Sequence, residues 1–374
     1  MSMPDVVVIG AGVVGASVAY RLATGGARVT LVDRGRPGAE TTSRSFAWLN
    51  ANDKPPPAYH ALNAEGIQAH RRLRDALGSG PWLHETGNVT CAVGEEDAAS
   101  LRGRVQRLQD VAYPAELISA ERAADLESRV RWPGGSGSAV AFAHFPLEGW
   151  AHGPTLVRCL VEAVRERGAA VREDDAVVAI ERAGERLAGV RLASDERVSA
   201  DAVVVAAGRF SDEVARLDRV ELPLAPTCGL LAITAPVEGG PRGVVHLPGV
   251  HFRPDGDGRV VLQDADTDAM VAADTPPDPA LPGCTELLRR AHRYLPDLAG
   301  TPIVEARVGI RPMPSDGFPV VGAVTGRAGL YLAVTHSGMT LGPLLGELLS
   351  AEILGGAPDS RLGPFRPDRR VRLG

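Results

Sequence analysis

The chain begins with an apolar run that gives way to a glycine-rich segment. Residues 6–9 are apolar and indicate a buried strand, and the pattern Gly-x-Gly-x-x-Gly occupies residues 10–15. Residues 16–23 then have helical periodicity, and residues 28–33 indicate a second strand that ends in an acid. This order predicts a strand–helix–strand unit with two parallel strands.

The rest of the chain contains further runs with an apolar period of about 3.6 residues, which predict helices, and short apolar or alternating runs, which predict strands. Helices are expected over residues 58–77, 95–108, 153–168, 285–294 and 341–354, and strands over 86–93, 139–145, 170–172, 177–181, 188–192 and 330–334, with another strand from residue 302.

Two patterns predict how these elements are grouped. The fully apolar run that ends in Ala-Ala-Gly, residues 201–208, is typical of a strand inside a parallel sheet. Residues 222–234, 243–253 and 258–264 instead alternate like antiparallel strands, with a hairpin turn at 255–258. The parallel pieces therefore fall at both ends and in the middle of the chain, with the antiparallel pieces between them.

We therefore predict an α/β protein, arranged as α+β in two interleaved domains. A Rossmann-like domain takes residues 1–45, 152–215 and 305–374, and an antiparallel-sheet domain takes residues 46–151 and 216–304.

Composition narrows the possible partners. The 374 residues carry a net charge of −6, which gives no electrostatic case for nucleic-acid binding. The four cysteines are isolated from one another, which predicts neither disulfides nor a metal site. The glycines within residues 6–23 argue against a membrane span, so we expect a cytoplasmic protein. Among the 40 basic residues, Lys54 is the sole lysine.

The N-terminal unit has the features of a dinucleotide site. Gly10 permits a tight turn, Gly12 lets the backbone approach a pyrophosphate, and Gly15 lets the helix pack close to the strand. The helix N-terminus then presents N–H groups to the anion. Asp33, 18 residues after Gly15, is placed to accept hydrogen bonds from a ribose.

Four motifs in order resemble the D-amino-acid-oxidase-like flavoproteins, and the layout is most similar to glycine oxidase. They are the glycine motif with Asp33, the Thr-Thr-Ser at 41–43, the Val-Val-Val-Ala-Ala-Gly at 203–208, and the C-terminal pair GIRPMPSDGFPVVG and THSGMTLGPLLGELL. The resemblance implies a glutathione-reductase-like FAD-binding domain, a substrate domain and a non-covalent FAD. The cofactor-binding residues that it implies are Gly10, Gly12, Val13, Val14, Gly15, Asp33, Arg34, Thr41, Thr42, Ser43, Arg44, Val177 or Val178, Ala207, Gly208, Arg311, His336, Gly338, Met339, Thr340 and Leu341.

The resemblance also implies a substrate and a reaction. Arg311 would hold the carboxylate of an amino acid or secondary amine, and hydride would pass from the carbon beside nitrogen to flavin N5. His251, Trp48, Asn50 and Lys54 are the other candidates for the catalytic pocket.

Departures from the family pattern leave alternatives open. The strand 259–263 lacks the lysine that promotes oxygen reduction in sarcosine-oxidase-like members, and Lys54 is the sole possible substitute. The electron acceptor is therefore oxygen or another molecule. A second arginine of some glycine oxidases is replaced by Ser337 and Gly338, which puts glycine in doubt as the substrate. Three alternative functions therefore stay open: a 2-hydroxy-acid dehydrogenase, a natural-product tailoring oxidase, and a flavoprotein subunit that needs a partner. The sequence does not predict the oligomeric state.

Overall fold

A six-stranded sheet forms the centre of one half of the molecule. The computed structural model describes residues 3–134 and 139–374, so residues 1–2 and 135–138 of the predicted domains lie outside it. The strand order is β20-β21-β13-β1-β2-β9, and all neighbours are parallel except β20 and β21. The bounds are β1 Asp5–Ile9, β2 Arg28–Val32, β9 Ala170–Arg172, β13 Ala202–Val205, β20 Val320–Ala323 and β21 Leu330–Val334.

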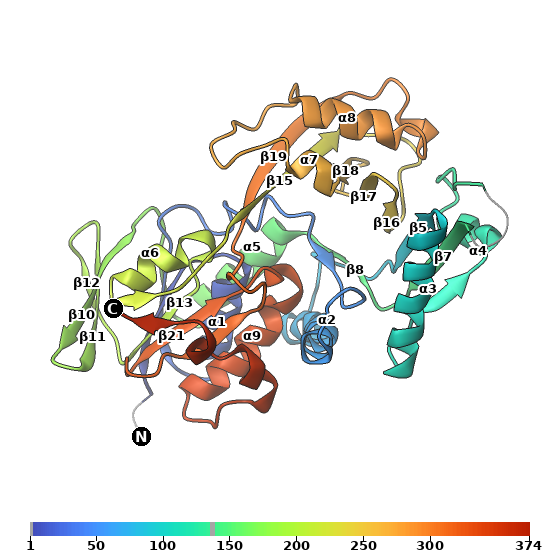
Figure 1. Cartoon of the computed structure of the whole chain (residues 1–374). Helices are drawn as coiled ribbons and strands as arrows, with labels where there is room; N and C mark the ends of the chain where they lie inside the picture. The colour runs from blue at the N-terminus through green and yellow to red at the C-terminus, as the bar shows by residue number, and fades with distance from the viewer. Residues whose placement is uncertain (1–2, 135–138) are drawn as a thin grey trace.

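Helices pack closely on one face of this sheet (Figure 1). They are α1 (Val13–Thr24), α5 (Gly153–Glu166) and α9 (Gly338–Ile353), and α1 lies along α9. A Cβ atom at Gly346 would lie 2.7 Å from the carbonyl oxygen of Ser17, so the glycine permits this close approach. Helix α2 (Pro57–Leu77) packs against α9. It falls in the segment predicted as substrate domain, yet it shares the core of α1.

The other face of the sheet is covered by a smaller antiparallel sheet, β10-β11-β12. Its strands are Val177–Ala183, Arg186–Leu192 and Arg197–Ser199. The short helices η2 (Gly208–Phe210) and α6 (Ser211–Arg216) follow β13, and the final β22 (Arg372–Leu373) pairs with β14 (Val220–Glu221).

An eight-stranded sheet forms the second half of the molecule, with the order β19-β15-β18-β17-β16-β5-β7-β6. It is antiparallel except for the parallel pair β16 and β5. Its strands are β5 Asn88–Val93, β6 Glu116–Ile118, β7 Val140–Phe145, β15 Thr227–Thr234, β16 Val244–Leu247, β17 Val250–Pro254, β18 Val260–Gln263 and β19 Ile303–Arg311. The helices of this half are α3 Glu95–Asp110, α4 Ala120–Leu126, α7 Ala265–Asp268 and α8 Pro282–Ala291. Helix α8 covers the apolar face of this sheet (Figure 1).

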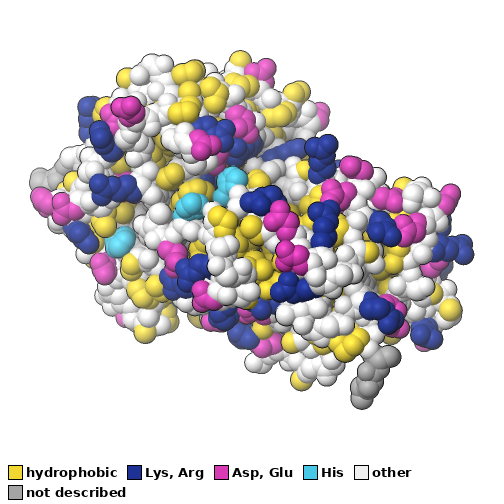
Figure 2. All heavy atoms as spheres, turned by 180° about the vertical axis from the view of Figure 1, so that it is seen from behind, with side chains coloured by type: hydrophobic (Ala, Val, Ile, Leu, Met, Phe, Trp, Pro, Cys, Tyr) yellow, Lys and Arg dark blue, Asp and Glu magenta, His cyan; other side chains and the backbone are white. Residues whose placement is uncertain are grey.

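A small third sheet, β3-β8-β4, lies between the two halves (Trp48–Leu49, Gly149–Ala151 and Leu83–His84). Its strand β3 presents Trp48 toward the eight-stranded sheet, where the Trp48 and His246 rings lie 4.1 Å apart. On the outer surface, Figure 2 shows Lys and Arg side chains interspersed with Asp and Glu over the face seen from behind.

Three predicted boundaries were wrong. The predicted strand 243–253 is a hairpin of two strands, because Pro248-Gly249 makes the turn with Gly249 at φ +75°. The apolar run 201–208 is a strand only to Val205, because the backbone then turns into η2. The last helix begins at Gly338 rather than Leu341. Strand β20 and helix α4 were not predicted.

Candidate FAD site and the adjoining polar cavity wall

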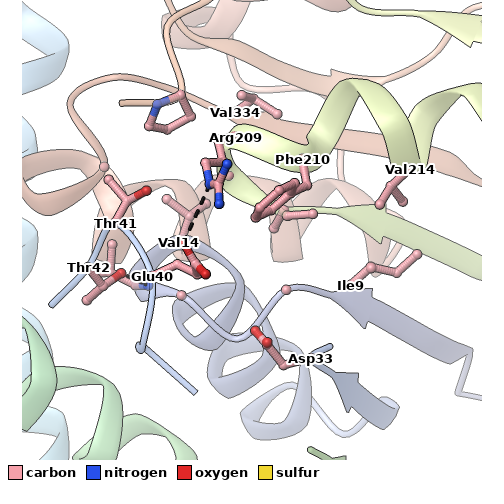
Figure 3. Close-up of a pocket in the computed structure, with 18 of the residues that line it drawn as sticks. Ile9, Val14, Asp33, Glu40, Thr41, Thr42, Arg209, Phe210, Val214 and Val334 are labelled. Carbon is pink, nitrogen blue, oxygen red and sulfur yellow. Dashed lines mark hydrogen bonds and ion pairs between the residues drawn. The ribbon is translucent and has the colours of Figure 1, made fainter. Parts of the chain in front are cut away.

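A pocket opens where the strands β1, β2, β13 and β21 end at the same edge of the parallel sheet. Ligands of open parallel sheets bind at the carboxyl ends of the strands, so its position is that of a cofactor site. Figure 3 shows residues of the glycine turn, the loop after β2 and η2 converging on it. Of the predicted cofactor residues, the lining includes Gly10, Gly12, Val13, Val14, Asp33, Arg34, Thr41, Thr42, Val177, Ala207, Gly208, His336, Gly338 and Met339.

The glycine turn is shaped by contacts that exclude side chains. Gly10 has φ +101°, and a Cβ atom there would lie 2.5 Å from the carbonyl oxygen of Ala206. A Cβ atom at Gly15 would collide with the carbonyl oxygen of Gly10. Helix α1 therefore begins directly at the pocket, and its first turn carries no acidic residue. The positive end of its dipole is thus available to an anion.

Two side chains fix the loops around this turn. Asp33 accepts hydrogen bonds from the backbone N–H of Ala11 (2.7 Å) and of Gly35 (2.9 Å). Burial raises the pKa of Asp33, and these two hydrogen bonds oppose that shift. Thr42 Oγ1 accepts a hydrogen bond from the N–H of Val13 at 3.1 Å. The loop after β2 is thereby tied to the start of α1.

The sequence did not predict a charged cluster that lines the pocket. Arg209 and Phe210 follow β13 in η2, and Glu40 lies opposite them in the loop after β2 (Figure 3). The sequence signal for Arg209 and Phe210 was their position directly after Ala207-Gly208, and that for Glu40 was its position directly before Thr41-Thr42. The other lining residues that were not predicted are Ile9, Val32, Arg36, Gly38, Ala39, Ser45, Ala176, Ala206, Glu213, Val214, Leu217, Pro312, Ala333, Val334 and Thr335.

The opposite end of the pocket is the turn before α9, and α2 holds it in place. Tyr59 Oη and Ser337 Oγ lie 2.7 Å apart, and a ring nitrogen of His70, Nε2, lies 2.7 Å from the carbonyl oxygen of Met339. His336 lines the pocket here, and burial lowers its pKa to about 4. The charges of Lys54 and Arg311 contribute to this lowering.

Arg311, at the end of β19, is held by the protein itself. Its Nη2 donates to Asp268 Oδ2 at 2.6 Å, and its Nη1 donates to the carbonyl oxygen of Cys228 at 2.7 Å. A Cβ atom at Gly229 would lie 2.5 Å from Nη2, so the glycine leaves room for the guanidinium. The remaining N–H groups of the guanidinium can still receive a carboxylate, because an arginine has five donors.

Two histidines of the eight-stranded sheet pack together, and Trp48 of β3 packs on one of them. His246 and His251 face each other across β16 and β17 with ring centroids 4.4 Å apart. Burial lowers the pKa of both rings, so they are neutral at pH 7. Within the described residues, His246 Nε2 and His251 Nδ1 have no hydrogen-bond partner. Both nitrogens are buried, so each carries the free-energy cost of a hydrogen bond that is not made.

Glu148 organises the loop that carries the other predicted residues. This buried carboxylate accepts from the N–H groups of Ala51 and Asn52 (2.9 Å each) and from Trp48 Nε1 (3.1 Å). Burial raises its pKa to about 7. The Asn50 N–H in the same loop donates to Thr340 Oγ1 at 3.3 Å.

Lys54 ends this loop, with its Nζ atom 5.9 Å from the centre of the Tyr59 ring. Burial lowers its pKa, and across residues 3–134 and 139–374 it has no ion pair within 4.0 Å. The cation is therefore free to meet a ligand.

Several predicted residues lie off the pocket lining. Val178 is 40% exposed, whereas its neighbour Val177 lines the pocket. The others that do not line it are Gly15, Ser43, Arg44, Arg311, Thr340, Leu341, Trp48, Asn50, Lys54 and His251. Among the described residues there is no group of three or more His, Cys, Asp or Glu placed to hold a metal ion. No helix in that part of the chain is long and apolar enough to cross a membrane.

The pocket fits FAD in its chemistry. It offers a helix N-terminus without an acid for the pyrophosphate, a half-buried acid at the end of β2 for a ribose, and a second helix N-terminus at Gly338.

Comparisons with known proteins agree with this architecture. The family model described as FAD dependent oxidoreductase (DAO) matches residues 5–352. The glycine oxidase of Geobacillus kaustophilus is 26% identical, over 98% of this chain and 97% of that protein. A protein of Rhizobium meliloti that is named as one of the subunits of an opine oxidase is 23% identical, over 98% and 97% respectively. The crystal structure of the Geobacillus glycine oxidase superimposes with a TM-score of 0.84 at 24% identity, covering all of both chains.

Proposed function

Because this chain belongs to the DAO family of FAD-dependent oxidoreductases, we propose that it oxidises the C–N bond of an amino acid or secondary amine that carries a carboxylate. The observation that carries this proposal is Arg311. Arg311 directly precedes Pro312, which lines the cofactor pocket, and its guanidinium retains donors for a carboxylate. The names of the similar glycine oxidases support the same class of substrate.

The residues of the chain bind and orient the substrate, and FAD supplies the acceptor for the two electrons removed as hydride. Arg311 takes the carboxylate, which fixes the carbon beside the nitrogen. Asp268 holds the guanidinium in place from behind with a bond of 2.6 Å. The amine must be neutral to react, and its proton leaves to solvent, because burial lowers the pKa of His246 and His251 and makes both rings poor proton acceptors. Trp48 covers these rings and excludes water from them.

Lys54 supports one choice of electron acceptor. A free ammonium beside the turn before α9 would stabilise negative charge that develops on oxygen. This supports oxygen as the electron acceptor. The experiment below distinguishes oxygen from another acceptor.

The test mixes the FAD-loaded protein anaerobically with a panel of amino acids, N-substituted amino acids and 2-hydroxy acids. The flavin absorbance measures whether each compound reduces the flavin. Bleaching by amines that carry a carboxylate, and not by hydroxy acids, is the expected result. Oxygen is then admitted, and fast reoxidation identifies an oxidase. Arg311→Gln should weaken substrate binding about 100-fold or more while FAD stays bound. Arg289→Gln, which removes an exposed arginine of α8, is the charge control. Unchanged turnover in Arg311→Gln would refute the assignment.

A second candidate is a flavoprotein subunit that reacts only with a partner, and one observation favours it. Two similar proteins, each matched over 98% of this chain, are named as subunits of an opine oxidase. In that case the purified chain would bind FAD but show no bleaching with any member of the panel.

A further inference from the structure

We propose that Arg209 binds the pyrophosphate of FAD and that Glu40 holds the Arg209 guanidinium as an internal anion until the cofactor arrives. Both side chains line the cofactor pocket, from opposite sides of it. Figure 3 shows them joined across the pocket, with Arg209 from η2 and Glu40 from the loop after β2. Neither position belongs to the glycine motif.

Glu40 lies among three guanidinium groups but is held tightly by none. Its carboxylate oxygens lie 3.5 Å from Arg209 Nε, 3.7 Å from Arg34 Nη2 and 3.9 Å from Arg44 Nη1. All three distances exceed those of charge-assisted hydrogen bonds, which are about 2.7–2.9 Å. The cluster is therefore a loose group of charges that a better anion can rearrange.

Arg209 is the member of this cluster that is built for a ligand. Its side chain is 27% exposed, against 48% for Arg34 and 41% for Arg44. Its Nε is buried and has no hydrogen-bond partner within the described residues. A buried N–H without a partner carries a free-energy cost that a ligand oxygen would remove. Arg209 therefore has an open donor inside the pocket.

Phe210 fixes the direction of this arginine. The guanidinium carbon of Arg209 lies over the Phe210 ring at 3.9 Å from its centroid, and that of Arg34 lies over the same ring at 3.4 Å. The aromatic ring thus places one arginine at the end of β2, beside Asp33, and the other at the end of β13. A cation over an aromatic ring is favoured and loses little side-chain freedom on binding.

The anion that suits this arrangement is a diphosphate. The N-terminus of α1 lies at the same pocket without an acid in its first turn, so backbone N–H groups and Arg209 can bind one anion together. A guanidinium fork matches phosphate oxygens in two-point contacts. The diphosphate would displace Glu40 from Arg209, and the displaced carboxylate would then repel it.

The experiment measures cofactor affinity, so it is independent of which substrate the protein oxidises. FAD is removed, and the apoprotein is titrated with FAD, ADP and adenosine by fluorescence and calorimetry. Arg209→Gln should weaken FAD and ADP binding about tenfold or more and leave adenosine binding unchanged. Glu40→Gln should tighten FAD and ADP binding about threefold, because it removes a repelling charge.

The matched controls come from an exposed ion pair on α5, Arg158 with Glu162. Arg158→Gln and Glu162→Gln should bind all three ligands like the wild type. Wild-type affinity for FAD in Arg209→Gln would overturn the proposal. An equal loss for adenosine and ADP would also overturn it, because the arginine would then act through the shape of the pocket. Weaker binding by Glu40→Gln would overturn the role of Glu40, and misfolding cannot produce the expected tightening.

Discussion

Replacement of His70 by glutamine should remove about 2 kcal/mol of the acid sensitivity of this protein. His70 lies on α2, is fully buried and bonds through Nε2 to the carbonyl oxygen of Met339 at the first turn of α9. Its Nδ1 has no partner within the described residues, so a second proton there would be an uncompensated buried charge. Burial accordingly lowers the pKa of His70 to about 4, from 6.5.

The effect of pH on stability follows from the difference between the pKa of His70 in the folded chain and in the unfolded chain. The unfolded chain binds a proton at His70 below pH 6.5, whereas the folded chain resists it until about pH 4. Stability is therefore complete above pH 6.5 and is lost as the pH falls toward 4. Between pH 8 and pH 5 this single group removes about 2 kcal/mol from the free energy of unfolding.

Urea denaturation of the FAD-saturated protein at pH 8 and pH 5, followed by circular dichroism, measures the effect. The difference between the two pH values should be about 2 kcal/mol smaller in His70→Gln than in the wild type. His292→Gln is the control, because His292 also bonds to a backbone carbonyl, that of Leu298 at 3.0 Å, but is exposed. It should keep the wild-type pH dependence. An equal pH dependence in His70→Gln and the wild type would show that His70 does not resist protonation.

Two further substitutions test the packing and the substrate site. Gly346→Ala should lower the free energy of unfolding by about 1–3 kcal/mol, because the new Cβ atom would lie 2.7 Å from the Ser17 carbonyl oxygen. Gly363→Ala is the control and should leave the free energy of unfolding unchanged, because a Cβ atom there meets nothing within 4 Å. A thermal midpoint as high as that of the wild type in Gly346→Ala would contradict the close packing of α1 on α9. Asp268→Asn removes one of the two carboxylate oxygens that accept hydrogen bonds from Arg311 and the Leu230 N–H, so the KM for a substrate with a carboxylate should rise about tenfold. A KM equal to that of the wild type would mean that Asp268 does not position Arg311.

The presence of β1, β13 and β21 in a parallel sheet was predictable because each local signal agreed with the fold. The glycine turn, the apolar run of β13 and the strand before α9 each indicated the same sheet. The hairpin of β16 and β17 was missed although its signal is present, since Pro248-Gly249 marks a turn inside an alternating run.

The contacts of the site were less predictable, because they depend on packing between distant segments. Arg311 and Asp268 are 43 residues apart in the chain, and only the packing of α7 on β15, next to β19, makes them a pair. Glu40 and Arg209 meet because the loops after β2 and β13 leave the same edge of one sheet. No local pattern marks either pair.

The interleaving of the two halves sets the order in which the protein can be assembled during synthesis. Strand β1 pairs with β13, about two hundred residues later, and α1 packs along α9, which begins at Gly338. Strand β1 and helix α1 must therefore wait until α9 has been synthesised before their apolar surface is fully covered. The cofactor pocket needs both segments, so FAD can bind in full only after α9 has been synthesised.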